Sequence, residues 1–122
     1  MNYSEMSNHN INRLVANEVA KDGLLHEQEG KIYIHEYAEP VGEFGGLCIG
    51  WKEFDPCNSW ADAGPIIQEH GIVVACYQRM EPQAWPAMEG TISSSHSRNK
   101  NPLRAAMECF LKMKRVGHAK AA

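Results

Sequence analysis

The chain has 122 residues, the size of a single domain, with an apolar content of 43% and a charged content of 22% that are ordinary for a globular protein. No segment reaches the ~20 consecutive apolar residues that a membrane-spanning helix needs. The net charge of −3 is uneven, because residues 1–50 carry −5, residues 51–90 carry −4 and residues 91–122 carry +6. A basic end on an acidic body suits contacts within the chain, self-association or an anionic partner.

The N-terminus favours a cytoplasmic location, and the cysteines are interpreted for that reducing compartment. The first ten residues have no basic start and no apolar stretch, unlike a secretory signal, so we expect a cytoplasmic protein without membrane contact. Cys48, Cys57, Cys76 and Cys109 lack the spacing of a zinc knuckle. We expect four free thiols that act as small, mostly buried side chains.

The first half of the chain predicts a helix followed by strands. Ser7 is a good N-cap, and apolar residues recur with helical spacing from Ile11 to Val19, until Asp22-Gly23 ends the helix. Residues 31–37, KIYIHEY, predict a strand with two partly apolar faces. Residues 47–54 fit a second strand, although an internal glycine weakens it.

A turn and a helix are predicted next. Residues 56–60 predict a tight turn that leads into a helix ending at His70, with Gly71 after it. Pro65 would break a hydrogen bond in a helix capped by Ser59, whereas it falls in the first turn if Asp62 is the cap. Both starts remain open.

The next segments predict a hairpin followed by a loop. Ile72–Gln78 is β-branched and apolar and predicts a central strand, and residues 83–89 are its expected hairpin partner. Pro86 would confine that partner to an edge or a bulge. Residues 90–100 form a polar stretch that we expect to be a mobile loop, as we do for residues 39–46.

The last helix completes an α+β domain over residues 1–122. Asn101-Pro102 is a strong helix start, and an apolar stripe follows from Leu103 to Leu111. The order helix, strand, weaker strand, helix, strand, strand, helix predicts a small antiparallel or mixed sheet with about three helices on one face. Glu18 and Lys114 interrupt the apolar stripes in the last turns of the first and last helices. Either these turns leave the core, or the two charges pair within one chain or across a dimer.

Two blocks and the N-terminus resemble a known family. FDPCNSWADAGPII at residues 54–67, NPLRAAMECFLKM at residues 101–113 and the opening MNYSEMSNHNINRLVA are similar to the NinX family of lambdoid and related phages. The loops at 39–50 and 93–98 depart from that pattern. The resemblance implies a small phage or prophage protein that acts in the bacterial cytoplasm, and it supplies no reaction and no catalytic residues.

The residues that could carry chemistry have simpler explanations. Asp55 and Asp62 could hold a divalent cation, but a proline turn and the positive end of a helix account for them. Cys57 lies near a helix N-terminus, which lowers a thiol pKa, yet no partner histidine can be named. The run Ser93–Ser97 has no nucleophile signature. We therefore expect no catalytic residue, metal or cofactor.

A non-enzymatic protein-interaction module that binds a host or phage protein is the leading hypothesis. Trp51, Trp60 and Trp85 could each anchor a partner. Trp60 is expected in the core because it falls on the apolar stripe of its helix, and Trp85 is the better candidate for an exposed aromatic residue. The predicted interaction surface consists of Asp55, Asn58, Trp60, Trp85 and Arg104.

Nucleic-acid binding through the basic C-terminal third is the alternative. A helix face with Arg104, Lys112 and Arg115, preceded by Arg98 and Lys100, suits phosphate contacts. The same charges also fit a solvated helix face. A small enzyme or metal-binding protein is a further alternative, and a homo-oligomer stays open.

Overall fold

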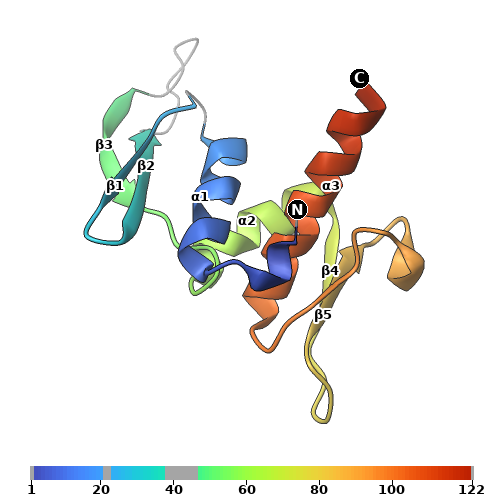
Figure 1. The fold of residues 1–122 in the computed structure, drawn as a ribbon. Coiled ribbons are helices and arrows are strands. Elements are labelled where there is room, and N and C mark those ends of the chain that lie inside the picture. The colour runs from blue at the N-terminus through green and yellow to red at the C-terminus, as the bar shows by residue number, and fades with distance from the viewer. Residues whose placement is uncertain (1, 21–22, 38–46, 122) are drawn as a thin grey trace.

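The computed structural model describes residues 2–20, 23–37 and 47–121, with side chains as far as residue 116 (Figure 1). The predicted loop at 39–46 lies outside these ranges. No helix within them combines the length and apolarity needed to cross a bilayer. The helical elements are η1 (Tyr3–Glu5), α1 (Asn8–Val19), α2 (Trp60–His70), η2 (Gly90–Ile92) and α3 (Pro102–Ala121). The strands are β1 (Leu25–Gln28), β2 (Lys31–Tyr37), β3 (Cys48–Glu53), β4 (Ile72–Ala75), β5 (Gln83–Pro86) and β6 (Ser97–Arg98).

The predicted α+β class is confirmed, but the strands form two small sheets instead of one. The first sheet has the order β1-β2-β3 and the second has the order β4-β5-β6, and all pairs in both are antiparallel. The sequence prediction missed β1 and β6. A two-residue turn joins β1 to β2, with Glu29 at φ 52° and Gly30 at φ 76°. This double positive φ is typical of a tight hairpin.

Helices α1 and α2 largely follow their sequence signals. The Ser7 hydroxyl caps α1 by accepting a hydrogen bond from the Asn10 N–H at 3.1 Å. Helix α2 ends at His70, and Gly71 adopts the left-handed conformation (φ 62°), as predicted. Its cap position is Ser59, whose side chain makes no cap hydrogen bond, so Pro65 lies inside the helix.

The second sheet corrects the predicted strand order. β5, not β4, is its central strand, although it ends in Pro86. Proline has no backbone N–H to donate. It is tolerated here because β6 pairs only with Gln83 and Ala84, so residue 86 has no hydrogen bond to make with β6. The predicted loop at 90–100 contains η2 and β6, and its Ser95 and Ser97 are buried.

Helix α3 is the centre of the core. It contacts both other long helices and all three strands of the second sheet. Residues 103–111 are buried without interruption, so this part of α3 has no solvated face. The predicted amphipathic helix is therefore wrong for the first half of α3, because neighbours cover it on every side.

Candidate interaction surface

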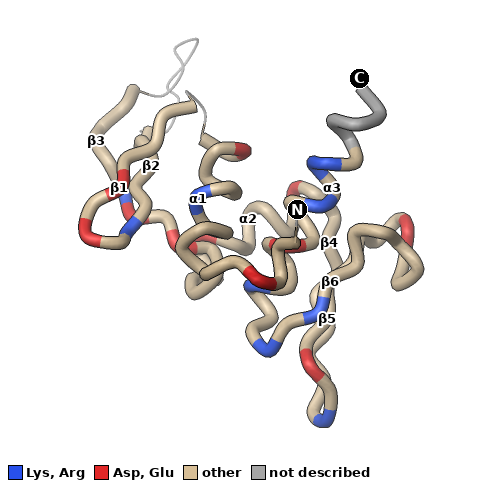
Figure 2. The backbone as a smooth tube through the Cα atoms, viewed as in Figure 1, with Lys and Arg blue, Asp and Glu red and all other residues tan. Residues whose placement is uncertain are grey.

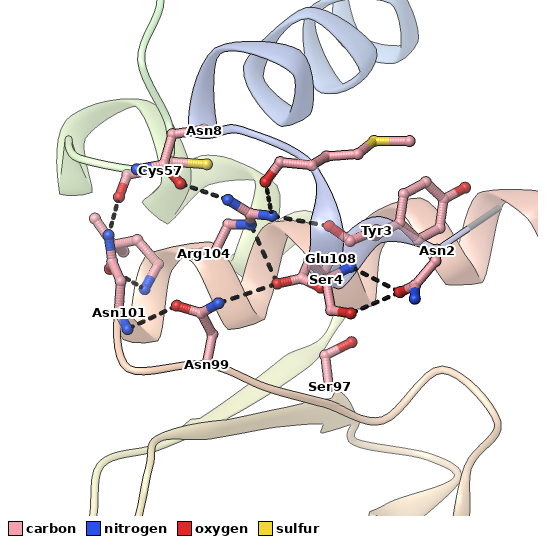
Figure 3. Close-up of polar contacts among 12 residues, drawn as sticks. Asn2, Tyr3, Ser4, Asn8, Cys57, Ser97, Asn99, Asn101, Arg104 and Glu108 are labelled. Atoms are coloured by element: carbon pink, nitrogen blue, oxygen red, sulfur yellow. Dashed lines mark hydrogen bonds and ion pairs between the residues drawn. The ribbon is translucent and has the colours of Figure 1, made fainter.

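Arg104 fastens the N-terminus of the chain to α3 (Figure 3). Its guanidinium donates to Glu108 Oε2 at 3.1 Å, to Asn8 Oδ1 at 2.6 Å, and to the carbonyls of Tyr3 (2.8 Å) and Met6 (2.6 Å). The Arg104 and Glu108 side chains are only 6% and 2% exposed. The prediction that Arg104 projects into solvent is therefore wrong, since its donors are used inside the fold.

The two sequence blocks that carry the family resemblance meet at Cys57. The Cys57 N–H donates to Asn12 Oδ1 at 3.1 Å, and the Cys57 carbonyl accepts from Asn101 Nδ2 at 2.5 Å. Asn12 also donates to Asp55 Oδ1 at 2.7 Å, and Asn58 donates to both Asp55 oxygens at 3.1 Å. These contacts join the first block, α1 and the start of α3, so the blocks encode a structural junction.

The acids and thiols of this junction have structural roles. The carboxylate of Asp62 accepts the Asp55 N–H at 2.9 Å, which closes the turn before α2. Burial raises the pKa of Cys57 to about 12 and that of Cys109 to about 12. Desolvation thus outweighs the lowering of the Cys57 pKa that a nearby helix N-terminus would cause. No cluster of three His, Cys, Asp or Glu residues suited to a metal ion occurs within the described ranges.

The other predicted interaction residues are scattered. Asn58 is exposed, and Trp60 is 58% exposed instead of lying in the core. The buried face of α2 contains Ala63 and Ile66, which lie about 60° and 120° around the helix from Trp60 at 100° per residue. Trp85 belongs to the second sheet, where it is half-buried and its ring stacks on that of His96 at a centroid distance of 6.1 Å.

The predicted nucleic-acid contacts do not form one patch. Lys112 is half-buried and donates to the His96 carbonyl at 3.0 Å. Arg98, Lys100 and Arg115 are exposed, but about 20 Å of helix rise separates the start of α3 from Arg115. Figure 2 shows the corresponding basic segments in the loop before α3 and again along its far half.

The structure also brings together an aromatic cluster that sequence reasoning did not assemble. Ile32 is 2% exposed and Ile34 packs against the core, so alternation directs Tyr33 and His35 to the opposite face of β2. Register then places His26 of β1 beside Tyr33, and Trp51 of β3 beside His35. We call His26, Tyr33, His35 and Trp51 the aromatic face.

The rings of the aromatic face touch one another. The His35 and Trp51 centroids are 3.9 Å apart, those of His26 and Trp51 are 5.7 Å apart, and those of His26 and Tyr33 are 6.1 Å apart. Figure 1 shows α1 on one side of the first sheet and no described helix on the other. The alternating Tyr and His residues of β2 are visible in the sequence, but the pairing that adds Trp51 and His26 is not.

Strand β3 is exposed on both of its faces. None of its six residues is buried. Ile49 is 63% exposed, Trp51 is 47% exposed, and Leu47 just before the strand is 77% exposed. Contiguous exposed apolar side chains of this kind mark interaction sites in globular proteins.

The fold and surface define a small α+β protein with a polar junction at its centre and an open aromatic sheet face at one end. A family model described as "Bacteriophage P22, NinX" matches residues 2–114. The chain therefore belongs to this NinX family and is a phage accessory protein, as its resemblance implied. Comparisons with curated proteins and with solved structures found no match.

Proposed function

We propose that this phage accessory protein is a protein-interaction module that acts in the bacterial cytoplasm and binds a host or phage protein through the aromatic face. The observation that carries the proposal is the exposure of β3 on both sides, with Ile49 and Trp51 presented to solvent. Tryptophan and tyrosine are the side chains most often found as interface anchors. Their ring contacts restrict their rotamers before binding, which lowers the entropic cost of ordering them.

The face of the sheet, and not its edge, is the proposed contact. The register between β2 and β3 shifts at Glu36/Tyr37, which makes the free edge irregular. Lys52 and Glu53 add charges beside that edge. A bulge and charged side chains are features that prevent a strand from pairing with another chain. We therefore expect side-chain recognition by the aromatic face.

Capture from a lysate of infected bacteria tests the proposal. The tagged full chain is compared with a Trp51→Ala/Ile49→Ser variant and with a Met88→Ser/Ile92→Ser control, whose residues are 98% and 94% exposed in another region. We expect specific proteins bound by the wild type and the control to be lost with the first variant. Quantitative mass spectrometry measures the ratio.

Two results would count against this surface. Wild-type protein that retains nothing specific would argue against an interaction module. Retention that survives Trp51→Ala/Ile49→Ser but fails in Trp60→Ala would move the site to the start of α2, where Asn58 and Trp60 are exposed.

A further inference from the structure

A groove of about 410 Å³ lies between the C-terminal halves of α1 and α3. Tyr3, Leu14 and Leu111 supply its apolar lining. Tyr3 and Leu111 are core residues at 7% and 5% exposure, and Leu14 is half-buried. The floor of the groove is therefore apolar and continuous with the core, and the groove is separate from the aromatic face.

Opposite charges stand on the two walls of this groove. Glu18 of α1 lies on one wall, and Lys114 and Arg115 of α3 lie on the other. Within the described chain no ion pair joins Glu18 to either cation, and the ammonium of Lys114 instead lies 5.6 Å from the centroid of the Phe110 ring. Of the two pairings considered from the sequence, the one within a chain is not formed. Glu18 and Arg115 are both exposed and available to a second molecule.

We propose that this groove is the contact between two copies of the chain, related by a two-fold axis. A two-fold contact uses the same surface on both molecules, so a self-complementary surface is required. The groove meets this requirement because it carries one acidic wall and one basic wall. Such an axis places Glu18 of each copy against Arg115 of the other, and it brings the apolar floors of the two grooves together.

Two further features fit a second copy better than an unrelated partner. The net charge is negative over residues 1–90 and positive over residues 91–122, and two copies in opposite orientation bring the acidic wall of one groove, with Glu18, to the basic wall of the other, with Arg115. Figure 1 also shows that the last turns of α3 continue past the end of α1. A contact limited to these turns is small, so the dimer is expected to be reversible.

Sedimentation velocity over a concentration series tests the dimer with the full chain alone. The variants are Glu18→Lys, Arg115→Glu and the double charge swap, and the controls are Glu69→Lys and Arg98→Glu, which make the same charge changes at exposed positions elsewhere. Each single swap is expected to weaken association by about tenfold, since it places like charges together. The double swap is expected to recover most of that loss, and high salt to weaken the wild type.

Several outcomes would overturn the proposal. The first is a wild type that stays monomeric at every concentration. The second is a dimer whose association is unchanged in both single-swap variants. The third is a double-swap variant that associates no more tightly than either single-swap variant. Controls that weaken the dimer as much as the groove variants would also overturn it, because the effect would then be one of net charge. Circular dichroism confirms that each variant is folded, which is expected because all four positions are exposed.

Discussion

The two sheets have the same number of strands and the same antiparallel order, yet they differ in what covers them. The inner face of the second sheet lies against α3 and buries Ile72, Ala84 and Pro86. The first sheet lies against α1 and buries only Ile32 among its strand residues. The number and order of the strands therefore do not show which sheet is buried and which is exposed. Contact with the central helix α3 does.

The attachments of the two sheets differ in chemistry as well. The second sheet is held by apolar packing on α3, and Lys112 adds a hydrogen bond to the segment before β6. The first sheet is held by Ile32, by the partly buried Leu25 and Ile34, and by an exposed cluster in which Glu27 of β1 accepts from Arg13 and pairs with His9 of α1. The end of the molecule that carries the proposed binding face is thus expected to be the easier one to open.

Removing Arg104 should have the largest effect on stability, because it should destabilise the whole domain and so both sheets. Arg104→Ala leaves the Glu108 carboxylate buried without its cation, and it leaves the carbonyls of Tyr3 and Met6 without their donor. Breaking a buried pair in this way costs about 3–5 kcal/mol of the free energy of unfolding. Urea denaturation measures this loss. A cost below about 1 kcal/mol would show that water replaces the guanidinium and that the junction is not structural.

Glu108→Gln is the matched control for Arg104→Ala, and it also tests how stability depends on pH. Burial raises the pKa of Glu108 above 4.5, although Arg104 opposes the shift. The folded chain then holds a proton that the unfolded chain has released, so this group makes stability fall as pH rises from about 4.5 through the raised value. Glu108→Gln should abolish that fall, and Arg104→Ala should extend it to higher pH.

Truncating Ile32 should destabilise the first sheet more than the second. Ile32→Ala removes the buried contact of the first sheet and should cost about 3 kcal/mol. Because the second sheet and α3 keep their packing, amide exchange should accelerate in β1 to β3 far more than in β4 and β5. Ile72→Ala is the comparison in the second sheet and should accelerate exchange throughout. Equal acceleration in both sheets after Ile32→Ala would mean that the domain opens as one unit.

Local signals made most of the fold predictable. Ser7, Gly71 and the start at Asn101-Pro102 act within a few residues of themselves, so the three long helices could be located from the sequence. β1 and β6 were missed because they are short, polar strands whose only support is pairing with a neighbour. Arg104 was misplaced because helical periodicity assumes one solvated side, and α3 has none along residues 103–111.

The candidate surface was less predictable than the fold. The blocks at residues 54–67 and 101–113 drew attention because they are rich in polar and aromatic side chains, but most of their polar groups meet one another around Cys57. The aromatic face depends on register, which pairs Trp51 with His35 although the two residues lie far apart in the sequence. A sequence pattern shows which residues of one strand share a face, but not which strand lies beside it.

The ionic cluster at Glu27 should give the smallest effect and the finest test of how the first sheet is held. The hydrogen bond from Arg13 lowers the pKa of Glu27, so the cluster contributes stability above pH 4.5 and loses it as pH falls through the lowered value. Glu27→Gln should remove this acid sensitivity and slightly raise amide exchange in β1, while β4 and β5 stay unchanged. Glu29→Gln, an exposed change at the adjacent turn, is the control. Because the cluster is solvent-exposed, added salt should reduce the difference between Glu27→Gln and the wild type, and a difference that persists in high salt would point to a packing effect instead.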